Sequence, residues 1–121
     1  MRVMAGLAAA VIVFSAGAVC AAPIEVYHAR LSEMDHYNSN GERLETVAGI
    51  IRQDRANYHR FHMRDDEDTG DDFFESPANR QRLEVLLLNG HLTSHDQRTI
   101  LRHEPLVTVR VYENYVDVEV E

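Results

Sequence analysis

Two histidines, His59 and His62, stand three residues apart, a spacing that places both imidazoles on one side of a helix. On a wheel of 100° per residue the two side chains lie about 60° apart, close enough to share a metal ion. A zinc site needs three or four converging ligands, and the sequence has no His-Glu-x-x-His signature. A third ligand would have to come from a distant residue such as His28 or His103. The pattern therefore favours unliganded surface histidines.

The acidic segment 65–72 is the second place where residue types could bind a metal. An EF-hand calcium loop has glycine at its sixth position and a bidentate glutamate at its twelfth. With Asp65 first, Gly70 falls at the sixth position, but Ser76 occupies the twelfth. The pattern predicts a solvated acidic loop, with no cofactor expected. Weak divalent-cation binding stays open, and its weak candidates are His59, His62, Asp65 and Asp68.

The serines give little indication of a hydrolase nucleophile. Three of those after residue 22, Ser39, Ser76 and Ser94, stand where they are expected to cap helices, and none lies in a Gly-x-Ser-x-Gly turn. Glu33 and Asp35 could in principle act as paired carboxylates, but residues two apart in a loop fix no geometry. A small secreted hydrolase, metal-assisted or not, that uses Asp35, His36, His59 and His62 is the alternative function.

The loop 35–41 carries more hydrogen-bonding side chains than a turn requires, and Asp35 and His36 open it. If a helix follows directly, its free N–H groups and partial positive charge would suit a small anion. Asparagine and serine side chains also bond to their own backbone in consecutive turns. The second interpretation is favoured, and Asp35 and His36 are kept as candidate binding residues.

The longest predicted helix, residues 41–62, has a charged residue on its apolar side. The residues Leu44, Val47, Ile51 and Tyr58 recur at helical intervals, and Asp54 falls within the arc that they define. A carboxylate on a core-facing arc is costly unless it is paired or hydrogen-bonded. Asp54 therefore either has an internal partner or lies in a pocket. In the second case the pocket is lined by Asp54, Arg55, Tyr58 and His62.

The first 21 residues are predicted to be a secretory signal peptide. Arg2 precedes an apolar run over residues 3–19, and Val19-Cys20-Ala21 offers small residues where a signal peptidase cleaves. The chain has 121 residues and a single cysteine, which lies inside this signal. Residues 22–121 would then form one small domain without thiols, in the periplasm or outside the cell.

Charge excludes two classes of partner. The basic residues are all arginine, and eleven of them stand against twenty acidic residues after residue 21, which gives a net charge of −9. Nucleic acids and anionic membranes both require clustered cations, and the sequence has no such run. The expected partner is an unidentified protein or small ligand, with no nucleic acid and no membrane contact after signal cleavage.

The secondary structure expected for residues 22–121 is of the α+β class. A short strand is expected at 24–28, and helices at 41–62, 77–88 and 94–102. Alternating valines around Glu113-Asn114 predict a C-terminal antiparallel β-hairpin, with Tyr112 opposite Tyr115 and Arg110 paired with Asp117. The valine face of the hairpin needs a cover, which the long helix supplies, and the first strand joins as a third member. A binding or interaction module is favoured over an enzyme.

Overall fold

The computed structural model describes residue 6, residues 10–12 and residues 21–121. Most of the predicted signal peptide lies outside the described residues, so cleavage after Ala21 stays a prediction. None of the helices that the structure describes is long and apolar enough to cross a bilayer.

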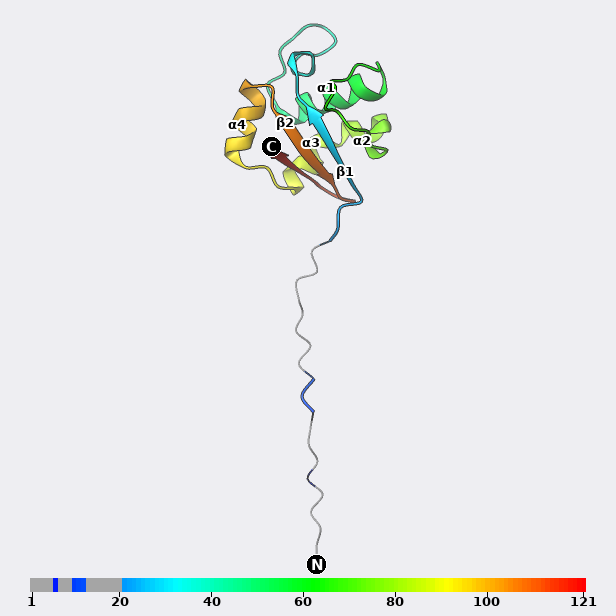
Figure 1. Ribbon diagram of the computed structural model, residues 1–121, viewed down its shortest axis with the longest axis vertical. Helices are drawn as coiled ribbons and strands as arrows, with labels where there is room; N and C mark the ends of the chain where they lie inside the picture. Colours follow the sequence, from blue (N-terminus) through cyan, green and yellow to red (C-terminus); the bar gives the residue numbers. More distant parts are fainter. Residues whose placement is uncertain (1–5, 7–9, 13–20) are drawn as a thin grey trace, which may run out of the picture.

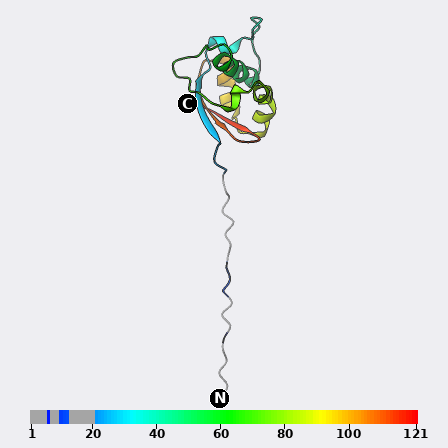
Figure 2. The same ribbon diagram turned by 90° about the vertical axis from the view of Figure 1, so that its right-hand side faces the viewer.

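The protein has an α+β fold in which helices cover one face of a three-stranded antiparallel sheet (Figures 1 and 2). This confirms the fold class predicted from the sequence. In chain order the elements are β1 (Glu25–Arg30), the 3-10 turn η1 (Glu33–His36), α1 (Val47–His59), the 3-10 turn η2 (Phe73–Glu75), α2 (Pro77–Gln81), α3 (Leu83–Asn89), α4 (Ser94–Arg102), β2 (Leu106–Val111) and β3 (Val116–Val120).

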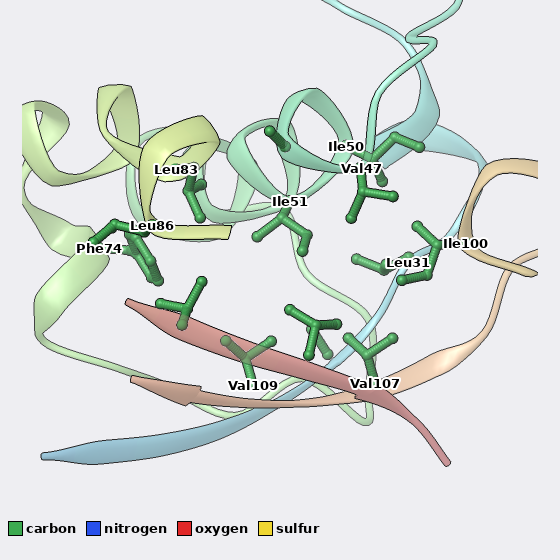
Figure 3. Packing of buried hydrophobic residues seen from close by; sticks show 14 of the residues in the cluster. Leu31, Val47, Ile50, Ile51, Phe74, Leu83, Leu86, Ile100, Val107 and Val109 are labelled. Atoms are coloured by element: carbon green, nitrogen blue, oxygen red, sulfur yellow. The ribbon is translucent and has the colours of Figure 1, made fainter. Parts of the chain in front are cut away.

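The sheet has the order β1-β2-β3, and the hairpin register is the predicted one. Val109 lies opposite Val118, and the Tyr112 and Tyr115 rings stack with centroids 4.3 Å apart. The first strand does join as the third member, antiparallel to β2. Figure 3 shows valines of the sheet pointing into the layer between sheet and helices, where they meet Ile51 of α1 and Leu83 of α3.

One cross-strand contact differs from expectation. Arg110 lies opposite Asp117 in the register, but its guanidinium bonds Glu119 at 3.0 Å. The Asp117 carboxylate accepts the backbone N–H of His91 at 2.7 Å instead. The shorter aspartate fixes the chain that leads into α4, and the longer glutamate reaches the arginine diagonally.

The long helix begins later than expected, at Val47 rather than near residue 41. The Asn38 side chain accepts the backbone N–H groups of Asn40 and Glu42, and Gly41 adopts a positive φ of 78°. These contacts hold the segment in a turn, so Ser39 caps no helix and Thr46 caps α1 by accepting from the Gly49 N–H.

The other helices also differ in detail. Ser76 and Pro77 start α2 as predicted. The expected single helix is divided into α2 and α3 at Arg82, whose ψ of −2° departs from the regular helical value. The last helix ends at Arg102 as predicted, with Thr93 rather than Ser94 as its cap.

The acidic segment 65–72 covers the free edge of β1. Thr69 exchanges hydrogen bonds with the backbone of His28, and the Asp68 carboxylate accepts the Arg30 N–H at 2.8 Å. The prediction of a fully solvated loop is therefore wrong for Asp68 and Asp71, which are buried. An uncovered edge strand invites pairing with other chains, and this segment prevents it.

Candidate functional site

The polar centre of the molecule is the side chain of Arg55, which is fully buried. Its Nε donates to Asp54 Oδ2 at 2.7 Å, and one terminal nitrogen donates to Asp71 Oδ1 at 2.9 Å and to the Thr69 carbonyl at 3.2 Å. Asp54 is thus buried, as the helical pattern indicates, and its partner is its own neighbour on α1 rather than an arginine from another element. The other terminal nitrogen of Arg55 has no partner among the described residues.

Two tyrosines enclose this guanidinium. The Tyr27 ring from β1 lies 4.1 Å from Arg55 Cζ, and the Tyr58 ring from α1 lies 4.6 Å from it. Aromatic faces attract a cation, and they attract it more strongly where water is excluded. Tyr27 therefore ties the sheet to α1 through a polar contact inside an otherwise apolar layer.

Burial is the largest influence on the pKa values of two buried carboxyl groups, those of Asp54 and Asp35. It raises the pKa of Asp54 well above its usual range, although the Arg55 charge acts in the opposite direction. It also raises the pKa of Asp35, against hydrogen bonds from Asn57 and Ser32 that lower it. The folded protein therefore holds these carboxylates at an electrostatic cost.

Asp71 connects this cluster to the surface. Its Oδ1 also lies 2.7 Å from His59 Nε2, and its Oδ2 accepts the Phe74 N–H at 2.6 Å. The Asp71 side chain is completely buried, whereas that of His59 is 10% exposed. His59 is thus held by a fixed carboxylate on one side and reaches solvent on the other.

His59 lines the first of two adjoining cavities between α1 and α2, which we call the arginine groove. The first cavity, of about 460 Å³, is lined by His59, Arg60, Glu75, Pro77 and Arg80. The second, of about 380 Å³, shares Arg60, Pro77 and Arg80 and adds Arg52 together with polar side chains that include Asn38, Gln53 and Gln81. Glu75 is the one carboxylate in either lining.

Two arginines of the groove, Arg52 and Arg80, are held by backbone carbonyls rather than by carboxylates, and Arg60 lies over the Phe61 ring. Arg80 donates to the Phe74 and Glu75 carbonyls at 2.8 and 3.1 Å, at the point where Ser76 caps α2. Arg52 donates to the Arg80 carbonyl at 3.3 Å. Across the described part of the chain, Arg52, Arg60 and Arg80 take part in none of the ion pairs.

The sequence candidates Asp35 and His36 lie in η1, and both are buried. Asp35 accepts from Asn57 Nδ2 at 2.9 Å and from the Ser32 N–H at 3.1 Å. The His36 ring lies between the carbonyls of Ser32 and Ile100, at 2.7 and 2.8 Å. These contacts join η1 to α1 and α4, and neither residue lines the arginine groove.

The four residues of the predicted pocket are only partly brought together. Asp54, Arg55 and Tyr58 are in one cluster, but His62 lies beyond the end of α1, exposed and with a positive φ of 54°. His62 therefore does not face His59 across a helical turn.

Among the described residues, no group of three or more His, Cys, Asp or Glu side chains is placed to hold a metal ion. Of the weak candidates, Asp68 uses both carboxylate oxygens on backbone N–H groups of Arg30 and Asp65. His59 is engaged by Asp71.

The arginine groove itself does not follow from the sequence pattern. Arg52 and Arg60 stand eight residues apart, which places them about 80° apart on a helical wheel and gives a weak signal of a shared side. Arg80 comes from α2, and nothing in the sequence indicates that α2 packs beside α1. Comparisons with protein-family models, curated proteins and solved structures found no match for this chain.

Proposed function

We propose that the protein is an exported binding module, periplasmic or secreted, that holds a small anionic molecule in the arginine groove. The observation that carries this proposal is the gathering of Arg52, Arg60 and Arg80 around two cavities with no carboxylate partner among the described residues. The exported location rests on the N-terminal sequence pattern alone.

The acidic net charge of the chain makes a cluster of three arginines, unpaired among the described residues, unexpected. The chain has 20 acidic and 12 basic residues, so an arginine that needs only neutralisation has many acidic residues available to it. Arg30 and Arg110 do pair with Glu67 and Glu119 on the outer side of the sheet. Three cations left unpaired in one concave place raise the local potential and favour an anion there.

The chemistry of the groove indicates a carboxylate or a phosphate. Guanidinium groups form charge-assisted, often bidentate hydrogen bonds with both. The amides of Asn38, Gln53 and Gln81 add donors and acceptors for hydroxyl or amide groups on the same ligand. The size of each cavity suits a small molecule, and the acidic surface elsewhere disfavours a nucleic acid.

Calorimetric titration of the chain with inorganic phosphate and with citrate tests the proposal. At low ionic strength we expect one binding site for at least one of these anions, and weaker binding as salt screens the charges. Arg60→Gln should weaken binding by about tenfold or more, since a charged hydrogen bond contributes about 1.5–3 kcal/mol.

The matched control is Arg98→Gln, which removes the same charge from an exposed position on α4 that lines neither cavity. It should change the affinity by less than about twofold, the size of a screened long-range effect. Absence of binding for both anions, or equal losses in the two variants, would contradict the proposal.

A further inference from the structure

His59 and Asp71 have the relation of a catalytic base to the carboxylate that orients it. His59 Nε2 lies 2.7 Å from Asp71 Oδ1, and Asp71 is itself held by Arg55 and by the Phe74 N–H. A carboxylate accepts hydrogen bonds, so the neutral His59 ring carries its proton on Nε2. The lone pair then lies on Nδ1, which forms no hydrogen bond with the described residues.

The same imidazole lines a cavity that contains two arginines. Arg60 and Arg80 line both cavities of the groove, and His59 lines only the first. A general base, a group that orients it, and cations for a developing negative charge are the parts that an acyl- or phosphoryl-transfer site requires. The first cavity has no Ser, Thr, Cys, Tyr or Lys in its lining, and its one carboxylate, Glu75, would be repelled by an anionic substrate, so we take water as the nucleophile.

We propose that the arginine groove hydrolyses phosphodiesters, with His59 as general base; this rests on the proposed anion binding. A phosphodiester has two unesterified oxygens for Arg60 and Arg80 and two substituents, which can occupy the two adjoining cavities. The amides of the second cavity suit a substituent that carries hydroxyl groups.

Hydrolysis requires one water molecule, His59 as the proton carrier, and the two arginines. His59 Nδ1 takes a proton from water as the water oxygen bonds to phosphorus, and the bond from phosphorus to the leaving oxygen breaks. An alkoxide leaving group takes the proton from His59 and departs as the alcohol. An aryloxide leaves without protonation, and His59 then returns its proton to solvent. Arg60 and Arg80 neutralise the charge on the unesterified oxygens throughout.

The test uses bis(p-nitrophenyl) phosphate, whose hydrolysis releases coloured p-nitrophenolate. We expect turnover by the purified chain and a loss of about 100-fold or more in His59→Gln, the usual contribution of a general base. Inorganic phosphate should still bind His59→Gln within about threefold of the unchanged protein, which also shows that the variant is folded. His95→Gln, at an exposed position of α4, should keep full turnover.

The outcomes separate this inference from the proposed function. Phosphate binding without turnover, or turnover unchanged in His59→Gln, would overturn the hydrolytic activity and leave anion binding in place. Absence of phosphate binding together with absence of turnover would overturn both. Turnover that is unchanged in Arg60→Gln would indicate a contaminating enzyme and would also overturn the assignment.

Discussion

Replacing Arg55 with methionine tests whether the buried cluster holds the fold together. The substitution keeps an unbranched apolar side chain between Tyr27 and Tyr58 and removes the charge. Asp54 then loses its hydrogen bond from Arg55, while Asp71 keeps its contacts with His59 and Phe74. Breaking a buried ion pair by removing one partner costs about 3–5 kcal/mol.

A loss of that size is a large part of the stability of a small domain, which is about 5–15 kcal/mol. Each kcal/mol lowers the Tm of a domain of this size by about 4–8 °C, so we expect a fall of more than about 12 °C. Chemical denaturation at pH 7 and pH 5 measures the loss. The loss should be smaller at pH 5, because the unpaired Asp54 carboxylate, whose pKa burial raises, can take up a proton there.

The matched control is Arg52→Met, three residues earlier on α1. Arg52 is partly exposed, and its hydrogen bond to the Arg80 carbonyl is 3.3 Å long. Its replacement should cost less than about 1 kcal/mol. Equal losses in the two variants would refute the argument, since they would mean that Arg55 is solvated and contributes no more than a surface residue.

Three other predictions follow from the structure and the sequence. Burial raises the pKa of the carboxyl groups of Asp54, Asp35 and Asp65 above the ordinary 3.8, so at these three groups the folded state binds more protons than the unfolded state. The free energy of unfolding, measured by equilibrium denaturation, should therefore rise as the pH falls from 7 to about 5. A free energy of unfolding that falls over this range would contradict the prediction. Gly90→Ala should lower the free energy of unfolding by more than about 2 kcal/mol, because the new Cβ would lie 1.7 Å from the Val116 carbonyl oxygen of β3. The control is Gly49→Ala, whose Cβ would lie 3.0 Å from a side-chain oxygen, and it should cost much less in the same assay. If residues 1–21 act as the predicted signal peptide, intact-mass analysis should find a mature chain that begins at Ala22, whereas a lipid adduct on Cys20 would show that the signal is that of a lipoprotein.

The hairpin and the Ser76 cap of α2 were accessible to sequence reasoning because they depend on neighbours along the chain. Alternating valines around a two-residue turn leave one register that places them all on one face, and the structure adopts it. Ser76-Pro77 begins a helix through a side-chain hydrogen bond and a missing N–H, both local effects.

The start of the long helix was predicted wrongly because two local patterns compete there. Ser39 and Glu42 have the spacing of a capping box, but the Asn38 side chain holds the same backbone in a turn. The bridge between Tyr37 and Arg43 adds a contact that the capping pattern does not include. The choice between cap and turn therefore depends on a pairing that residue types alone do not reveal.

The burial of Asp54 followed from helical periodicity, but the identity of its partners did not. Periodicity placed the carboxylate toward the core, but it does not reveal that Arg55 bonds Asp54, or that Asp71 reaches Arg55 because segment 65–72 folds back over β1. The arginine groove depends in the same way on α2 packing beside α1. Contacts between elements distant in sequence are the part of this molecule that local patterns do not specify.

An NMR titration of the chain with inorganic phosphate, observed at the arginine Nε–H signals, tests anion binding in the groove residue by residue. We expect saturable shifts for Arg52, Arg60 and Arg80, which line the groove without ion-pair partners among the described residues. The signals of Arg30 and Arg110, each paired with a glutamate on the sheet, should stay in place. Shifts spread evenly over all exposed arginines, or none at all, would contradict a specific anion site in the groove.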